Sequence, residues 1–321
     1  MIDPFGRYLN YLRISVTDLC NLRCHYCMPE DVEKCRHADV LSYEEIARLT
    51  RILAGEGIEI VRLTGGEPLV RPHLEALVRL LRDIPGIRHV TLTTNGVLLK
   101  EQLPVLKAAG LSSVNISLDS MCTEHFEKIT GRDELSHVLA GISAAVESGI
   151  PTKINVVPQL GYNEEELADL AALAKDMPLQ VRFIEMMPIG RGKAQEGLTT
   201  EQVQEALRAR WPEMTPDSRR YGAGPAVYYR IPGFAGSIGF ISAVHGKFCS
   251  ECNRLRLTSR GELRLCLASE AGADLKAPLR AGASDGELVE IIRRAVALKP
   301  KEHHFLEDEE EATRGMYQIG G

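Results

Sequence analysis

The chain has 321 residues, a formal net charge of −6 and a pI near 5.9. This acidic balance argues against a general nucleic-acid binder, although basic residues can still gather inside one site. No apolar run approaches the roughly 20 residues that span a bilayer, and the first residues lack the apolar core of a secretion signal. We therefore expect a soluble cytoplasmic protein with reduced thiols, built as one large domain with an appendage or as two domains.

Strand and helix patterns alternate over the first 184 residues. In chain order, the first predicted element is a strand over residues 11–16. The next is a helix that begins at a capping box formed by Ser42 and Glu45 and ends at Gly55 or Gly57. The further predicted strands cover 58–63, 90–93, 113–118, 152–157 and 180–184, and the further helices cover 72–82, 100–109, 137–148 and 164–175. This alternation predicts an α/β fold with a parallel sheet, and it fits both an open doubly wound sheet and a partial barrel.

The pattern changes near residue 190. A flexible connection is predicted over 190–193, an amphipathic helix over 200–210, and short antiparallel strands over 221–231 and 237–242. We expect two domains, a core over residues 1–190 and a smaller α+β module over 191–321. The acidic run 307–311 is interpreted as solvated surface.

Three cysteines, Cys20, Cys24 and Cys27, follow the first predicted strand at Cys-x3-Cys-x2-Cys spacing. Three thiolates supply one ligand fewer than a 4Fe–4S cluster needs, so one iron would remain open to another molecule. Structural zinc would need a fourth ligand, and His25 lies too close in sequence to share the metal. A disulfide framework does not suit a chain of this length with eight cysteines. The spacing favours a ligand-binding iron–sulfur cluster.

A second set, Cys249, Cys252 and Cys266, has Cys-x2-Cys-x13-Cys spacing. Structural zinc is the main alternative to a second cluster. The remaining cysteines, Cys35 and Cys122, match no ligand spacing and are interpreted as free thiols.

Basic residues lie inside the second cysteine set. Strand alternation places Arg254, Arg256 and Thr258 on one face, opposite Leu255 and Leu257. Two guanidiniums can clamp a phosphate chain, but an exposed basic strand face is the plainer interpretation of the pair alone.

The segment 64–68, Thr-Gly-Gly-Glu-Pro, directly follows the second predicted strand. Its glycines would let the backbone approach a polar ligand closely, and a tight turn before Pro68 explains them equally well.

The first cysteine set, Tyr26 within it, and the glycine motif some forty residues later together resemble the radical S-adenosylmethionine (SAM) enzymes. The chain is similar, nearly from end to end, to the GTP 3′,8-cyclases of that group, the MoaA family, which start molybdenum-cofactor biosynthesis. The similarity is carried by both cysteine sets, the terminal Gly320 and Gly321, and segments 12–18, 62–68, 92–96, 115–119 and 182–185. The departures are Leu19, where relatives often have Arg, and Ile60, where some have a phosphate-binding Lys.

The resemblance implies a partial (β/α)6 TIM-type barrel closed by the C-terminal module, and a lyase that cleaves SAM to a 5′-deoxyadenosyl radical. The radical takes hydrogen from C3′ of GTP, whose ribose carbon then joins guanine C8 to give 3′,8-cyclo-7,8-dihydro-GTP. The ligands of two 4Fe–4S clusters would be Cys20, Cys24, Cys27, Cys249, Cys252 and Cys266. The SAM contacts would be Tyr26, Gly66, Ser117 and Met187. The GTP contacts would be Arg13, Arg62, Thr93, Lys153, Arg254, Leu255 and Arg256, with Arg182, Thr258 and Glu67 as further candidates. Gly320 and Gly321 would support catalysis from the tail.

The resemblance also implies partners. We expect GTP as substrate, a flavodoxin or ferredoxin as reductant, and product transfer to cyclic pyranopterin monophosphate synthase, with no nucleic acid and no membrane. Whether the chain forms a homodimer is left open. Two other functions also remain open: a radical SAM peptide maturase with an auxiliary cluster, and a zinc-stabilised binding protein without catalysis.

Overall fold

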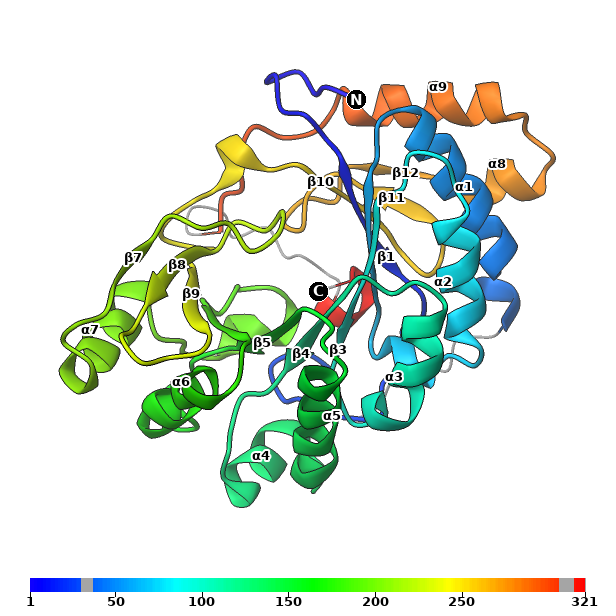
Figure 1. Cartoon of the computed structure of the whole chain (residues 1–321). Coiled ribbons are helices and arrows are strands. Elements are labelled where there is room, and N and C mark those ends of the chain that lie inside the picture. The colour runs from blue at the N-terminus through cyan, green and yellow to red at the C-terminus, as the bar shows by residue number, and fades with distance from the viewer. Residues whose placement is uncertain (30–36, 306–314, 321) are drawn as a thin grey trace.

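The computed structural model describes residues 1–29, 37–305 and 315–320. Within these residues one curved sheet has the strand order β12-β11-β10-β1-β2-β3-β4-β5-β6-β9-β8-β7 (Figure 1). The strands are β1 (Tyr11–Ser15), β2 (Ile60–Thr64), β3 (His89–Thr94), β4 (Ser113–Ser117), β5 (Thr152–Val156), β6 (Gln180–Ile184), β7 (Thr215–Asp217), β8 (Val227–Arg230), β9 (Ser237–Ile241), β10 (Arg254–Leu257), β11 (Glu262–Arg264) and β12 (Gly272–Asp274). From β10 to β9 all neighbouring strands are parallel. The sheet is not closed, which confirms the predicted partial barrel.

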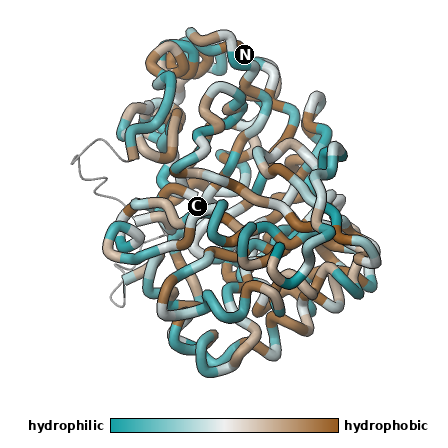
Figure 2. Tube along the Cα trace, turned by 90° about the vertical axis from the view of Figure 1, so that its left-hand side faces the viewer, coloured by the Kyte–Doolittle hydropathy of each residue, from teal (hydrophilic) through white to brown (hydrophobic). Residues whose placement is uncertain are grey.

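Helices cover the outside of this sheet (Figure 1). They are α1 (Tyr43–Gly55), α2 (Leu74–Arg82), α3 (Leu99–Ala108), α4 (Thr123–Thr130), α5 (Leu135–Glu147), α6 (Leu167–Asp176), α7 (Thr200–Arg210), α8 (Lys276–Arg280) and α9 (Asp285–Val296). Hydrophobic and hydrophilic residues alternate along them (Figure 2). In α2, for example, Leu74, Leu77, Val78 and Leu81 are buried at helical spacing, so one face packs on the strands.

The predicted elements match β1 to β6 and their helices within a few residues. The capping box of Ser42 and Glu45 at the start of α1 is confirmed by hydrogen bonds in both directions. Helix α4 was not predicted from the sequence. The predicted strand over 221–231 is wrong in its first half, because β8 begins only at Val227. Gly222 has φ +97° and Pro225 lacks an amide donor, so this stretch forms a loop.

The last third of the chain adds strands to both sides of the barrel core. Strand β10 pairs with β1, and β9 pairs with β6, both in parallel. The two predicted domains therefore share one sheet, and the boundary at residue 190 stays a prediction. The described part of the C-terminal segment ends in the middle of the molecule (Figure 1).

Several sequence-based expectations lie outside the described residues, namely those for Cys35, the acidic run 307–311 and Gly321. In the part of the chain that the structure describes, no helix is both long and apolar enough to cross a membrane.

Candidate active site

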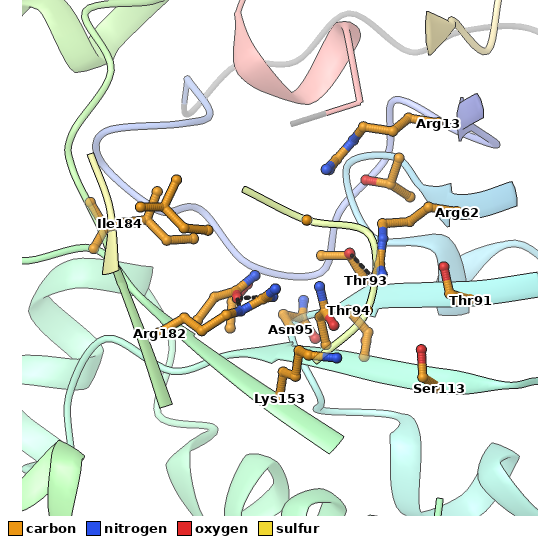
Figure 3. A pocket seen from close by; sticks show the side chains of 18 of the residues that line it. Arg13, Arg62, Thr91, Thr93, Thr94, Asn95, Ser113, Lys153, Arg182 and Ile184 are labelled. Atoms are coloured by element: carbon orange, nitrogen blue, oxygen red, sulfur yellow. Dashed lines mark hydrogen bonds between the residues drawn. The ribbon is translucent and has the colours of Figure 1, made fainter. Parts of the chain in front are cut away.

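A cavity of about 870 Å³ runs through the inside of the barrel (Figure 3). It is lined by residues at the carboxyl ends of the strands, the usual site position in such barrels, and also by residues at their amino ends, such as His89, Ser113 and Thr152. Its lining includes most of the predicted site residues: Arg13, Cys20, Cys24, Tyr26, Cys27, Arg62, Gly66, Glu67, Thr93, Ser117, Lys153, Arg182, Met187, Arg254 and Arg256. The side chains of Leu255 and Thr258 are buried outside it, Leu255 on the core-facing side of β10.

The loop after β1 brings Cys20, Cys24 and Cys27 to one side of this cavity. The Leu22 amide nitrogen lies 3.4 Å from Cys20 Sγ, and Asn95 Nδ2 lies 3.7 Å from it. Hydrogen bonds to thiolate sulfur are a regular feature of iron–sulfur sites. Burial raises the pKa of Cys20 to about 11 and that of Cys27 to about 12, so a bound metal centre is needed to hold them as thiolates.

The chemistry of the first loop suits a cluster. Its three thiolates can each bind a separate iron of a 4Fe–4S cluster, whereas structural zinc needs a fourth ligand that converges on the same atom.

Gly65 and Gly66 pack against the residues that lead into the cysteine loop. A Cβ atom on Gly66 would lie 2.4 Å from the Leu19 carbonyl oxygen, and one on Gly65 would lie 2.5 Å from that of Thr17. The Gly66 amide also donates to the Thr17 carbonyl over 2.8 Å. The glycines are thus needed for close backbone contact between segment 64–68 and the segment leading to Cys20. Neither interpretation made from the sequence, close approach to a ligand or a tight turn, included this contact.

Glu67 holds the loops after β2 and β3 together. Its buried carboxylate accepts hydrogen bonds from the Leu69 amide at 2.9 Å, Thr94 Oγ1 at 2.7 Å and the Asn95 amide at 2.6 Å. Burial outweighs these bonds and raises the pKa of Glu67 to about 7. Through Asn95, which also contacts Cys20, Glu67 supports the cysteine loop.

Asp119, at the end of β4, fixes Tyr26. The Tyr26 hydroxyl donates to Asp119 Oδ2 over 2.7 Å, and the Val157 amide donates to Oδ1 over 2.8 Å. Asp119 is buried, and this burial raises its pKa to about 6. Asp119 and Asn95 were not predicted as site residues, although Asn95 directly follows β3 and Asp119 lies two residues after β4, where site residues of barrels gather.

Three arginines form a row across neighbouring strands. The register pairs Arg13 of β1 with Arg62 of β2 and with Arg256 of β10, so their side chains share one face. Arg62 donates to the Tyr11 hydroxyl, the Leu92 carbonyl and Thr93 Oγ1. These partners are neutral, so the positive charge of Arg62 remains available to an anion.

Lys153 and Arg182 point into another part of the cavity, from β5 and β6 (Figure 3). Burial, with Arg182 and Arg62 nearby, lowers the pKa of Lys153 to about 7. Arg182 donates through Nε and Nη2 to Asn155 Oδ1, at 3.1 and 2.5 Å. Buried cations of this density are stable only when an anion balances them, which a polyphosphate can do.

The second cysteine set lies outside the cavity lining, and Cys252 and Cys266 are near enough to Arg256 to act on its charge. The Arg254 guanidinium stacks 4.8 Å from the centre of the Phe248 ring, and both residues line the cavity. Burial opposes ionisation of Cys252, but Lys299 and Arg254 nearby lower its pKa overall. A thiol favoured as thiolate beside the other two cysteines fits a metal-ligating role.

The C-terminal segment reaches the arginine row. The Gly320 carbonyl accepts hydrogen bonds from Arg13 Nε at 3.0 Å and from Arg256 Nη1 at 2.7 Å. A Cβ on Gly320 would lie 3.1 Å from Thr64 Cγ2, and its φ of +70° favours glycine. These contacts place Gly320 at the arginine row, and its predicted support of catalysis stays a prediction.

Two family models match the chain, the radical SAM superfamily over residues 14–174 and Molybdenum Cofactor Synthesis C over residues 179–305. The chain therefore belongs to the radical SAM superfamily. Proteins named GTP 3′,8-cyclase align over the full length of both chains, at 48% identity in Moorella thermoacetica and 46% in Pelotomaculum thermopropionicum. Within the superfamily, the chain belongs to the GTP 3′,8-cyclase family.

Solved structures support the fold independently. SuiB of Streptococcus suis aligns with a TM-score of 0.60 and 15% identity, covering 81% of this chain and 61% of SuiB. SuiB bound to SAM aligns with a TM-score of 0.59 and 16% identity, covering 88% of this chain and 68% of SuiB. At these identities the likeness concerns the fold alone.

Proposed function

We propose that this protein is a GTP 3′,8-cyclase of molybdenum-cofactor biosynthesis, a lyase that works in the cytoplasm with SAM and two 4Fe–4S clusters. One observation carries the proposal: the first cysteine set and a row of three arginines face the same cavity, and two cysteines of the second set lie near Arg256 of that row. The sequence relatives of that name support it.

The residues present fit both cofactors. Cys20, Cys24 and Cys27 would hold the first cluster, and Cys249, Cys252 and Cys266 the second. When bound, the first cluster and SAM supply the radical that takes hydrogen from C3′ of GTP. The chain's own part in the SAM site is to present Ser117, Met187 and the Tyr26 ring that Asp119 orients.

The chain's part in the GTP site is to neutralise and orient the triphosphate. Arg13, Arg62 and Arg256 stand in one row, and a desolvated guanidinium binds phosphate oxygens far more strongly than an exposed one. An acidic protein can therefore bind a polyanion, because its cations gather in the cavity. The enclosing walls also keep solvent from the reacting carbon atoms.

Lys153 gives the GTP site a pH dependence. Its pKa of about 7 in the free protein rises when phosphate binds, since the charged ammonium is then favoured. The KM for GTP should therefore increase as the pH rises through about 7, by up to about tenfold per pH unit. Lys153→Arg stays charged throughout, so its KM should change less between about pH 6 and pH 8.5. Initial rates across this range test the prediction, and equal slopes for both proteins would contradict it.

Asp119 should act on SAM through Tyr26. Asp119→Ala removes the acceptor of the Tyr26 hydroxyl and of the Val157 amide, so SAM affinity should fall on the order of tenfold. Asp119→Asn keeps the shape and should lose much less. Equilibrium binding of SAM to the reconstituted protein measures both. A loss of GTP affinity as large as that of SAM affinity would show general damage instead.

Several further features belong to this proposal. We place the domain boundary near residue 190. We expect a flavodoxin or ferredoxin as the reductant and cyclic pyranopterin monophosphate synthase as the enzyme that receives the product. A homodimer is the assembly to test.

Anaerobic reconstitution with iron, sulfide, SAM and a reductant tests the function. The expected result is about eight irons per chain and 5′-deoxyadenosine that forms only with GTP. SAM cleavage indifferent to GTP would favour a peptide maturase. Zinc without iron would favour a binding protein, and either result would overturn the proposal.

A further inference from the structure

Lys299 is a buried lysine beside the second cysteine set. It follows α9 in the chain, and only 3% of it is exposed. Its ammonium donates hydrogen bonds to the Arg254 carbonyl over 3.1 Å and to the Leu265 carbonyl. Arg254 stands two residues after Cys252, and Leu265 directly precedes Cys266. The lysine therefore joins the backbone of the two segments that carry these cysteines.

Arg7 fixes the segment that follows Lys299. Its guanidinium donates to the Pro300 carbonyl over 2.6 Å and to the Lys301 carbonyl over 2.8 Å. The same guanidinium donates to the Cys249 carbonyl over 2.8 Å. The N-terminal part of the chain thus holds the backbone after Lys299 against the first cysteine of the set, and the lysine has a fixed position relative to all three cysteines.

The buried positive charges of this region exceed the carboxylates that pair with them. Asp3 forms an ion pair with Arg7 at 2.5 Å, whereas no carboxylate pairs with Lys299 in the described part of the chain. Lys299 does not line the cavity, so a ligand there is not its counter-ion. Burial lowers the pKa of Lys299, and ionised Cys252 and Cys266 oppose this effect. A buried ammonium without a counter-charge is unfavourable, and an anionic group at the cysteines would balance it.

An iron–sulfur cluster bound by three thiolates is such an anionic group. The thiolates outweigh the positive charge of an oxidised 4Fe–4S core, and each added electron makes the bound cluster more negative. A fixed positive charge nearby stabilises the reduced form more than the oxidised form, so it raises the reduction potential. Solvent cannot screen this effect at Lys299, because the lysine is buried.

We propose that Lys299 is a positioning residue of the second cluster, which joins the segments of Cys252 and Cys266 and raises the cluster's reduction potential through its positive charge. This inference rests on the proposed function, which places a cluster at these cysteines. The potential decides which electron carriers can reduce the second cluster. A neutral hydrogen-bond donor at this position could still join the two segments but could not supply the charge, so the two roles of the lysine are separable.

Two substitutions of Lys299 separate its charge from its hydrogen bonds. Lys299→Gln keeps a donor but removes the charge, so the reduction potential of the second cluster should fall. At a fixed potential we expect the ratio of reduced to oxidised cluster to fall about tenfold, which is about 59 mV for a one-electron couple. Lys299→Arg keeps the charge, so the ratio should change less than about threefold. An unchanged ratio in Lys299→Gln would overturn the proposal.

Lys301→Gln is the matched control for the loss of charge. Lys301 lies two residues further along the same segment, and its side chain is exposed. The substitution removes the same charge from the chain, but solvent already screens that charge, so the potential of the second cluster should not change. A shift in Lys301→Gln as large as that in Lys299→Gln would show an effect of net charge alone and would also overturn the proposal.

The potentials are measured on the full chain with both clusters reconstituted, by redox titration followed by electron paramagnetic resonance. The signal that is lost in Cys266→Ala belongs to the second cluster, and only this signal should move in Lys299→Gln. Loss of about four irons in Lys299→Gln with unchanged SAM affinity would support the positioning role, whereas loss of both clusters would overturn it. Failure of the proposed function would appear separately, in the unsubstituted protein, as zinc or no metal at the second cysteine set.

Discussion

Replacing Gly66 with alanine is expected to displace the first cysteine loop and abolish activity. The new Cβ would lie 2.4 Å from the Leu19 carbonyl oxygen and 2.8 Å from that of Asp18, and both atoms belong to backbone. Backbone cannot move aside as a flexible side chain can, so the segment leading to Cys20 must shift. We expect the free energy of unfolding to fall by about 3 kcal/mol and the reconstituted protein to carry about half the normal iron.

Gly55→Ala is the matched control for this substitution. Gly55 ends α1, has open space around its Cβ position, and does not adopt a left-handed φ. Alanine should leave the iron content unchanged and slightly increase stability, since it restricts the unfolded chain. Denaturant unfolding and iron analysis of both variants measure the effects. A Gly66→Ala protein with full iron and full activity would show that the close contact is not required.

Removing the side chain of Arg256 is expected to weaken GTP binding on the order of a hundredfold while both clusters stay intact. Arg256 is buried at one end of the cation row, beside Arg13, and contacts no cysteine sulfur through a hydrogen bond within the described residues. A desolvated, bidentate guanidinium–phosphate contact is worth more than a surface ion pair, which explains the size of the effect.

Arg256→Lys separates charge from geometry. Lysine keeps the positive charge but cannot form the two parallel bonds of a guanidinium, so we expect an intermediate loss, about tenfold. Isothermal titration calorimetry measures the GTP affinity of both variants, and iron analysis of the same samples measures their cluster content. Loss of iron in Arg256→Ala, or an unchanged GTP affinity, would contradict the assigned role.

Much of the barrel was predictable because its signals are local. The capping box at Ser42 and the strand–helix alternation depend on residues close in sequence, and β1 to β6 lie where the pattern placed them. Pairing of β10 with β1 joins residues about 240 positions apart, and no local pattern encodes such a contact. The loop at Gly222 was predicted as strand, whereas the left-handed φ of Gly222 and the missing amide donor of Pro225 keep it out of the sheet.

The site was predictable in composition but not in arrangement. The cysteine spacing and the position of Arg13 and Arg256 could be read from the chain, but the row that joins them to Arg62 depends on the register of three strands. Asp119 and Asn95 escaped detection for a related reason. Their partners, Tyr26 and Cys20, come from a different strand–loop segment, so the contact exists only in the folded protein.

During synthesis, β1 and β6 remain at the open edges of the sheet until the last third of the chain has emerged, because their partners β10 and β9 come later in sequence. Unpaired edge strands attract other chains, so an incomplete polypeptide is exposed to aggregation. The same late segment carries Cys249, Cys252 and Cys266. A chain that ends near residue 190 therefore lacks the cysteines proposed to hold the second cluster and leaves both sheet edges unpaired, which favours removal of truncated chains over their accumulation.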